Sequence, residues 1–161
     1  MSFPTPPRAG RASGLAGWQQ QYETLRMSAA QAAELIRPGD AMAVSGSANW
    51  PYAVDEALAA RLRPLGGHME LLSLYAPLDT TLLAPDYADL VSYQANFFSG
   101  ERLLAKQGNV WYVPTHLGAT GDWMCARKPR AAVITCSAPD EHGWMSRSLW
   151  GASVPRAVLE Q

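Results

Sequence analysis

A short apolar strand that runs directly into a polar loop is the feature that most constrains this chain. Residues 131–136, Ala-Ala-Val-Ile-Thr-Cys, are rich in β-branched side chains and lie between Pro129 and Pro139, which predicts a buried strand. The loop 137–143 then brings a hydroxyl, a carboxylate and an imidazole together. Ligands of open α/β sheets gather at the carboxyl ends of strands. The pattern therefore predicts a candidate site here, while the same Pro, Asp and Gly are also typical of a plain turn.

The rest of the chain alternates predicted strands with predicted helices. Ser28 is placed to cap a helix, and Pro38-Gly39 to form a type II turn. We expect strands at 41–45, 69–75, 90–98, 110–113 and 145–148, and helices at 19–26, 29–36, 52–62, 101–106, 118–127 and from 154 onward. Trp18, Tyr22 and Leu25 would share a face of the first helix. The alternation predicts an α/β domain with an open, largely parallel sheet and flanking helices.

Composition narrows the classes of protein that fit. Residues 1–17 hold three prolines and three glycines, which predicts a flexible leader before a single domain at 18–161. A formal net charge of −1 gives no basic field for nucleic acid, and no run is long enough for a membrane span. Two cysteines make no disulfide framework, so we expect a cytoplasmic protein. With 48% hydrophobic and only 17% charged residues, one face is expected to be covered by another chain.

Residue spacing disfavours several kinds of site. No CxxC, HxxxH or HExxH pattern occurs, so no metal site is expected, and no GxSxG serine elbow is present. Cys136 falls in the predicted buried strand, where a thiol acts as a small hydrophobe. Trp111 and Tyr112 are expected in the core. The loop 46–51 joins a strand to a helix, a layout that offers backbone N–H groups to an anion, but its single glycine matches no phosphate-binding motif.

Three segments carry a family resemblance when they are taken in order. The first comprises Ile36-Arg37-Pro38-Gly39-Asp40, Val44-Ser45-Gly46, Pro51 and Ala57-Leu58. The second comprises Phe98-Ser99-Gly100, Arg102, Gly108 and Tyr112-Val113-Pro114-Thr115-His116-Leu117. The third is Ser137-Ala138-Pro139-Asp140-Glu141-His142-Gly143, similar to an S-x-P-D-x-H-G segment that follows a core strand. Together they resemble the acetyl-CoA hydrolase/transferase group of family I CoA-transferases, such as acetate, butyrate or 4-hydroxybutyrate CoA-transferase.

The resemblance implies that the chain is the N-terminal half of a CoA-transferase, which moves CoA between an acyl-CoA and a small carboxylate. The reaction would pass through a glutamyl-CoA intermediate whose glutamate lies in a C-terminal half outside this chain, so this chain alone would be inactive. A CoA thioester would be the substrate, without a permanently bound cofactor. Three loops would wall the acyl and carboxylate pocket, with these substrate-binding residues: Gly46, Ser47, Asn49, Trp50, Pro51, Pro114, His116, Ser137, Pro139, Asp140, His142 and Gly143.

The expected partners are the C-terminal half, in cis or in trans, and further copies of the chain, with neither nucleic acid nor a membrane. Two alternatives stay open: an acyl-CoA hydrolase half, and a non-catalytic binding or assembly subunit with the same fold. Asp140 would either orient His142, which lies on the same side of an extended loop, or bond its own backbone. Arg147 departs from the apolar residue of the family pattern, so it would favour an anionic substrate if it faces the pocket.

Overall fold

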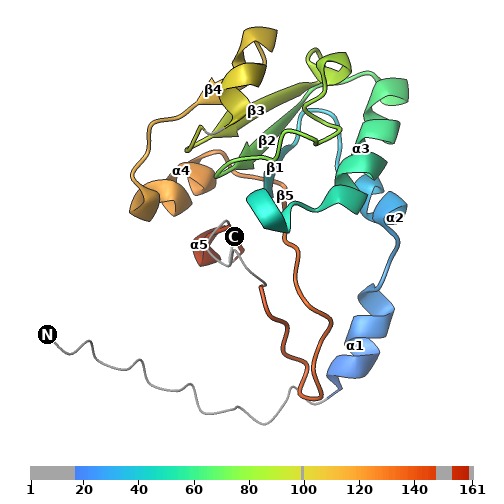
Figure 1. Ribbon diagram of the computed structural model, residues 1–161. Helices are drawn as coiled ribbons and strands as arrows, with labels where there is room; N and C mark the ends of the chain where they lie inside the picture. Colours follow the sequence, from blue (N-terminus) through green and yellow to red (C-terminus); the bar gives the residue numbers. More distant parts are fainter. Residues whose placement is uncertain (1–16, 99, 148–153, 160–161) are drawn as a thin grey trace, which may run out of the picture.

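The computed structural model describes residues 17–98, 100–147 and 154–159 (Figure 1). Except for Gly17, the predicted leader lies outside these residues. The strands are β1 (Ala41–Val44), β2 (Met69–Ser73), β3 (Val91–Ala95), β4 (Val110–Tyr112) and β5 (Ala131–Val133). The α-helices are α1 (Trp18–Leu25), α2 (Ala29–Glu34), α3 (Tyr52–Leu65), α4 (Thr120–Ala126) and α5 (Arg156–Leu159). Short 3₁₀ helices cover Ser47–Asn49, Pro85–Tyr87, Gly100–Gln107 and Leu117–Ala119.

The five strands form one sheet in the order β4-β3-β2-β1-β5, and every pairing is parallel. This confirms the predicted α/β class. Successive strands from β1 to β4 lie side by side, after which the chain returns through α4 to place β5 on the other side of β1. The strand order therefore reverses between β1 and β5, which is the point where open α/β sheets commonly bind ligands.

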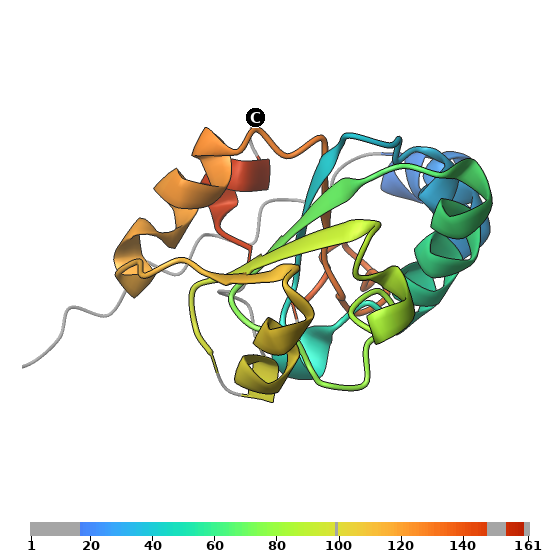
Figure 2. The ribbon, with the colours of Figure 1, turned by 90° about the horizontal axis from the view of Figure 1, so that it is seen from above.

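Helices cover both faces of the sheet (Figure 2). On β1, Met42 and Val44 belong to the larger apolar cluster with Leu58 and Leu62 of α3. Ala43, between them, packs on the other face in a smaller cluster with Met124 of α4. Alternate strand residues point to opposite faces, so one apolar strand supplies both cores.

Several local predictions are confirmed. Ser28 forms a complete capping box with Gln31 at the start of α2, because each side chain accepts a hydrogen bond from the other residue's backbone N–H. Gly39 adopts φ +91° in the turn before β1, a conformation that glycine takes without steric penalty. α3 ends three residues later than predicted and includes Pro64, and Gly66 occupies its C-cap position.

The structure corrects four predictions near the sheet edges. β5 ends at Val133 and is a half-buried strand at the edge of the sheet. The predicted buried strand at 131–136 is therefore wrong in both its length and its burial. Cys136 lies beyond β5 and is exposed. Residues 145–147 form no strand; residue 148 lies outside the described part. Trp111 and Tyr112 are 56% and 54% exposed on edge strand β4 rather than in the core. An edge strand has only one neighbour, so its apolar sequence does not guarantee burial.

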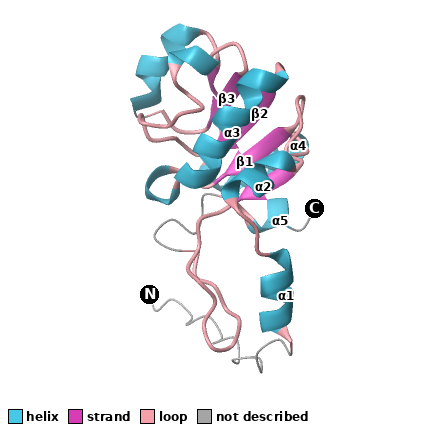
Figure 3. Ribbon diagram, turned by 90° about the vertical axis from the view of Figure 1, so that its right-hand side faces the viewer, coloured by secondary structure: helices cyan, strands magenta, loops and turns pink. Residues whose placement is uncertain are grey.

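Residues 134–147, which we call the arm, leave the sheet after β5 and extend beside α1 (Figures 1 and 3). The arm folds back on itself, since Ser137 N donates to Ser146 O and Asp140 N to Trp144 O, both at 2.9 Å. In Figure 3, α1 and the arm stand together below the layered body. None of the helices in the described ranges is both long and apolar enough to cross a membrane.

Candidate functional site

A cavity of about 620 Å³ opens at the carboxyl ends of β2, β3 and β4, and we call it the β2–β4 cavity. Its volume falls in the range of small-molecule sites. Aromatic and aliphatic side chains form most of its wall, with a few polar groups between them. The lining residues are Leu74, Tyr75, Asn96, Phe97, Tyr112, Thr115, Leu117 and Thr120.

Ser47 ties the predicted loop 46–51 to the wall of this cavity. The Tyr75 hydroxyl donates to Ser47 Oγ at 2.6 Å, and Ser47 N donates to Tyr75 O at 3.1 Å. Ser47 has φ +54°, a left-handed conformation that non-glycine residues rarely adopt. Such backbone strain persists where surrounding contacts enforce it and is concentrated at functional sites.

The crevice between β1 and β5, where the strand order reverses, is closed by hydrogen bonds. Ser45 Oγ donates to Asn49 O at 2.5 Å and accepts from Thr135 N at 3.2 Å. Asn49 Nδ2 donates to Arg147 O at 2.9 Å, so the loop is tied to the far end of the arm. Asn49 is therefore a buried bridge between loop and arm. The open space lies instead over β2 to β4.

The backbone amides of loop 46–51 are largely engaged within the fold. Besides the Ser47 bond, Asn49 N donates to Gly46 O and Trp50 N to Ser47 O, at 3.2 and 3.0 Å. These amides are not directed at an anion. Trp50 is 4% exposed and belongs to the main core, and Pro51 occupies the N-cap position of α3.

Gly46 has a packing role in the same loop. A Cβ at this position would lie 2.5 Å from Tyr75 O and 2.9 Å from Ser73 Oγ. Only glycine leaves room for β1 and β2 to end so close together.

Pro114 and His116 follow β4 and flank Thr115, which lines the β2–β4 cavity. Both are exposed. His116 Nδ1 accepts a hydrogen bond from Gly118 N at 3.1 Å and so caps the 3₁₀ helix Leu117–Ala119. This residue orders the loop beside the cavity, while its neighbours on either side in sequence, Thr115 and Leu117, contribute to the wall.

Ser137, Pro139, Asp140, His142 and Gly143 all belong to the arm, and none of them lines the β2–β4 cavity. The arm as a whole extends beside α1 (Figure 3), where Gly143 lines a second cavity. Asp140 Oδ1 accepts from the backbone N–H groups of His142 and Trp144, both at 2.9 Å, as in an Asx turn. His142 Nε2 lies 3.3 Å from Glu141 Oε1. Of the two alternatives for Asp140, the turn with its own backbone is present.

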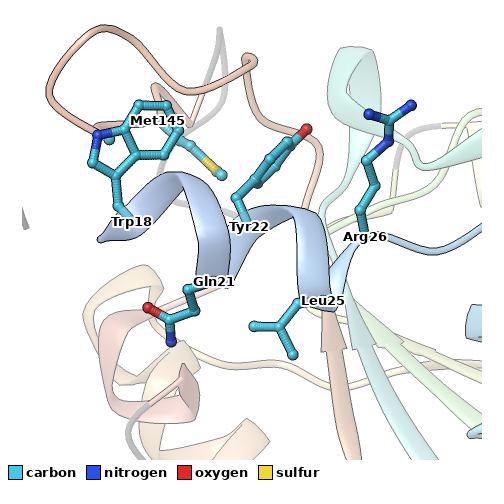
Figure 4. A pocket seen from close by; sticks show the side chains of 7 residues that line it. Trp18, Gln21, Tyr22, Leu25, Arg26 and Met145 are labelled. Carbon is cyan, nitrogen blue, oxygen red and sulfur yellow. The ribbon is translucent and has the colours of Figure 1, made fainter. Parts of the chain in front are cut away.

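A second cavity of about 340 Å³ lies between α1 and the arm (Figure 4). Trp18, Tyr22 and Leu25 all line it, as their predicted common face requires. In Figure 4, Trp18 and Tyr22 lie on the side of α1 next to Met145. A Cβ on Gly143 would come within 2.7 Å of the Trp18 ring, and Gly143 has φ +85°. Gly143 therefore permits both the turn and the contact between arm and helix.

Arg147 is half-buried at the end of the arm. Its Nη2 donates to Val154 O, which tethers the segment leading to α5, and its own carbonyl accepts from Asn49. The guanidinium thus belongs to a structural contact rather than to open solvent.

Groups of three or more His, Cys, Asp or Glu with a geometry for metal do not occur among the described residues. Cys125 in α4 and Cys136 in the arm are both unpaired thiols. None of the described residues that line the β2–β4 cavity carries a charge. The cavity therefore offers hydrogen bonding and apolar contact, without a nucleophilic carboxylate or thiol of its own.

Sequence reasoning missed most of the wall of this cavity. The sequence predicts Tyr75, Asn96 and Phe97 to be strand residues, and Thr120 to be part of a helix. The available signal is position: each of the first three lies at or near the carboxyl end of a predicted strand, where side chains from neighbouring parallel strands converge.

Comparisons with known proteins agree with this architecture. RipA from Yersinia pestis has a similar solved structure, with a TM-score of 0.72 and 20% sequence identity over 81% of this chain and 33% of RipA. Structures of two single-residue variants of RipA give TM-scores of 0.72 and 0.70, each at 20% identity over 81% of this chain and 32% of theirs. At this identity the similarity shows the fold.

The chain spans about a third of the length of these solved structures. None of the curated proteins compared with the chain matches it. The sequence model of the acetyl-CoA hydrolase/transferase N-terminal domain matches residues 11–160.

Proposed function

This chain belongs to the acetyl-CoA hydrolase/transferase N-terminal domain family, and from that premise we propose that it is the N-terminal half of a CoA-transferase. The half would act with a glutamate-bearing C-terminal half, in cis or in trans, to move CoA from an acyl-CoA to a small carboxylate. A CoA thioester would be the substrate, and no permanently bound cofactor is required. The unpaired cysteines fit a reducing, cytoplasmic setting.

The transfer would pass through covalent intermediates on the glutamate. The glutamate carboxylate attacks the thioester carbonyl, which gives an acyl-glutamyl anhydride and releases the CoA thiolate. The thiolate attacks the glutamyl carbonyl, which forms glutamyl-CoA and releases the donor's acid. The acceptor carboxylate reverses these two steps, so that a new acyl-CoA leaves and the glutamate is restored.

One observation supports the assignment of the glutamate to the other half: the described residues that line the β2–β4 cavity include no carboxylate and no thiol. The glutamates with described side chains lie elsewhere. Glu23 pairs with Arg26, Glu141 is 84% exposed beside His142, and Glu70 is near Gln94 within the sheet. Glu34 and Glu56 lie exposed on helices. A glutamate carboxylate in a dry pocket would have to come from another segment.

The arm and α1 support the proposal of a partner half. They stand apart from the layered body, and they present exposed apolar side chains, among them Leu25, Trp144 and Met145. Contiguous exposed apolar surface commonly marks an interaction site. We place the companion half against this surface, where Ser137, Pro139, Asp140 and His142 would border the shared active site.

The test is an assay with acetyl-CoA and propionate in which propionyl-CoA and free CoA are both followed by chromatography. This chain alone should give no propionyl-CoA, whereas a mixture with a separately produced glutamate-bearing half should give it. Free CoA without propionyl-CoA in the mixture would identify a hydrolase instead. Turnover by the lone chain that Glu141→Ala abolishes would contradict the proposal.

In the active mixture, His142→Ala should lower turnover by about tenfold to a thousandfold if the arm borders the site. His68→Ala, at an exposed position before β2, is the matched control. Equal turnover for the two variants would leave the arm with a structural role only.

A further inference from the structure

A further cavity, of about 390 Å³, lies at the amino ends of the strands, and we call it the basic cavity. It opens beside the start of β1 and beside the segment that joins the end of α4 to β5. Because every strand pairing is parallel, this end of the sheet is opposite to the β2–β4 cavity, and the two cavities share no lining residue. The wall of the basic cavity includes Asp40, Ala41, Glu70, Arg127, Lys128 and Arg130.

Three cations in this wall lack a carboxylate partner. Arg127, Lys128 and Arg130 lie within four consecutive residues, and the Arg130 backbone is fixed beside β1, since its N–H donates to Ala41 O at 2.8 Å. No carboxylate of the described residues lies within ion-pair distance of any of the three side chains. The cluster therefore presents positive charge that the described part of the chain does not neutralise.

Arg127 is held in place by an uncharged group. Its Nε and Nη2 donate to Gln94 Oε1 at 3.1 and 2.7 Å, and Gln94 is buried in β3. A guanidinium has five N–H groups, so three remain for an anion. Gln94 thus orients the cation and leaves its charge intact.

The two carboxylates in the wall have uncharged hydrogen-bond donors. Asp40 Oδ2 accepts from Arg37 N at 2.8 Å, and Glu70 Oε2 accepts a long hydrogen bond from Gln94 Nε2 at 3.5 Å. Lys128 and Arg130, by contrast, have no side-chain hydrogen bond with any described residue. The groups that lack partners in this cavity are the cations, so the ligand that it suits is an anion.

Lys128 has an unusual backbone conformation for a lysine. It follows the C-cap residue of α4 and has φ +49°, where glycine or asparagine is the usual residue. Two roles would account for a lysine at this position. Its charge would either complement the helix dipole at the end of α4 or bind an anion in the cavity, and a glycine variant separates the two.

We propose that the basic cavity binds a small anion with at least two negative charges, a phosphate ester or a polycarboxylate, at a site separate from the transfer reaction. The two guanidinium groups can each bind two oxygens of a phosphate or carboxylate group, and Lys128 adds a point charge. A single carboxylate would engage only part of this cluster. Since the cavity lies at the amino ends of the strands, the bound anion would not contact a reactant in the β2–β4 cavity.

Calorimetric titration of the chain with pyrophosphate and with citrate tests the inference and distinguishes a phosphate site from a polycarboxylate site. Divalent cations are left out, and potassium chloride keeps the ionic strength constant, because salt screens exposed charges. At least one of the two anions should bind, and acetate should bind about tenfold more weakly or not at all.

Variants of the wall locate the site. Lys128→Gly and Arg130→Gln should each weaken binding about fivefold, because each removes one charged partner of the anion. Glu70→Gln keeps an oxygen for Gln94 and removes a repelling charge, so it should strengthen binding about threefold. Lys106→Gln, at an exposed cation outside the cavity, is the matched control and should bind as the wild type does.

Urea unfolding without an anion separates the two roles of Lys128. Glycine adopts the left-handed conformation without steric penalty, so Lys128→Gly should be at least as stable as the wild type. Lower stability with unchanged affinity would assign Lys128 to the helix end and overturn the inference. It would also be overturned if neither anion binds, or if Lys106→Gln weakens binding as much as Lys128→Gly. Coenzyme A that binds here about tenfold more tightly than pyrophosphate would contradict a site separate from the transfer reaction.

Discussion

Gly46 determines how closely the ends of β1 and β2 approach each other. The only space for its side chain is occupied by Tyr75 O and Ser73 Oγ, and a backbone carbonyl yields less readily than a flexible side chain. The same approach brings Ser47 to the Tyr75 hydroxyl and so shapes one wall of the β2–β4 cavity.

Gly46→Ala should destabilise the chain by about 1–3 kcal/mol, because the added methyl group overpacks this contact. The free energy of unfolding in urea measures the effect. Gly118→Ala is the control, since its Cβ would meet only the exposed His116 ring, at 3.3 Å. Similar stabilities for the two variants would show that the β1 and β2 ends separate without penalty.

Asp55 is a buried carboxylate that joins α3 to the backbone at Thr81 and Leu82. It is 2% exposed and accepts from Thr81 N at 2.7 Å and from Leu82 N at 3.3 Å. Burial raises the pKa of Asp55 above its ordinary value of 3.8, although these N–H groups act in the opposite direction. Between the two pKa values the folded chain binds more protons than the unfolded chain.

This carboxyl therefore contributes stability that is fully present below pH 3.8 and is lost as the pH rises through its raised pKa. The Asp55→Asn variant has no ionisable group at this position. The free energy of unfolding of the wild type minus that of the variant should therefore fall as the pH rises above 3.8. Urea unfolding of both proteins at several pH values measures the difference. A difference that is constant with pH, or that grows in favour of the wild type, would contradict the raised pKa.

At the scale of elements, the arm is held both by α1 and by residues that follow β1. Its tip is held by the turn at Asp140 and by the packing of Gly143 against Trp18. Its base is held by Asn49, which bonds Arg147 O, and by Ser45, which bonds Thr135 N. The arm is thus held at its tip and at its base, and the second cavity lies between the arm and α1.

Trp18→Ala should speed amide hydrogen exchange at Asp140, Gly143 and Ser146, whose N–H groups hold the arm together. The loss in global stability should be smaller than the roughly 3 kcal/mol that a fully buried tryptophan gives, because Trp18 is only half-buried. Trp111→Ala, an exposed tryptophan on β4, is the matched control. Unchanged protection in the arm would mean that α1 does not support it.

At the scale of the whole molecule, exposed apolar side chains occur both beside the arm and around the β2–β4 cavity, where Phe97, Tyr112 and Leu117 are each more than half exposed. The chain also spans about a third of the solved structures that it resembles. Both facts fit the proposal that a companion half would cover this surface.

The lone chain should therefore self-associate reversibly as its concentration rises, and the glutamate-bearing half should replace this association with a defined complex. Sedimentation velocity of the chain, of the companion and of their mixture measures both effects. Trp144→Ser, which removes an exposed apolar side chain from the arm, should weaken the complex. A chain that stays monomeric and does not bind the companion half would contradict the proposed partnership.

The sequence by itself determined the features that depend on neighbours along the chain. The period of apolar residues, the capping box at Ser28 and the turn at Gly39 each rest on contacts within a few residues, and these predictions are confirmed. The parallel α/β class followed because strands alternate with helices. The resemblance in three segments led to the family that the chain belongs to.

Only the tertiary structure decided which side chains meet. Asn96 and Thr120 come from different parts of the chain, and they line the same cavity because the end of β3 and the start of α4 meet at one edge of the sheet. The sequence predicts a core strand at β5, yet its place in the sheet order makes it an edge strand. The Asp140 carboxylate had two partners within reach, and the fold of the arm brings it to backbone amides. Such choices depend on distances between remote residues, which periodicity and local propensity do not encode.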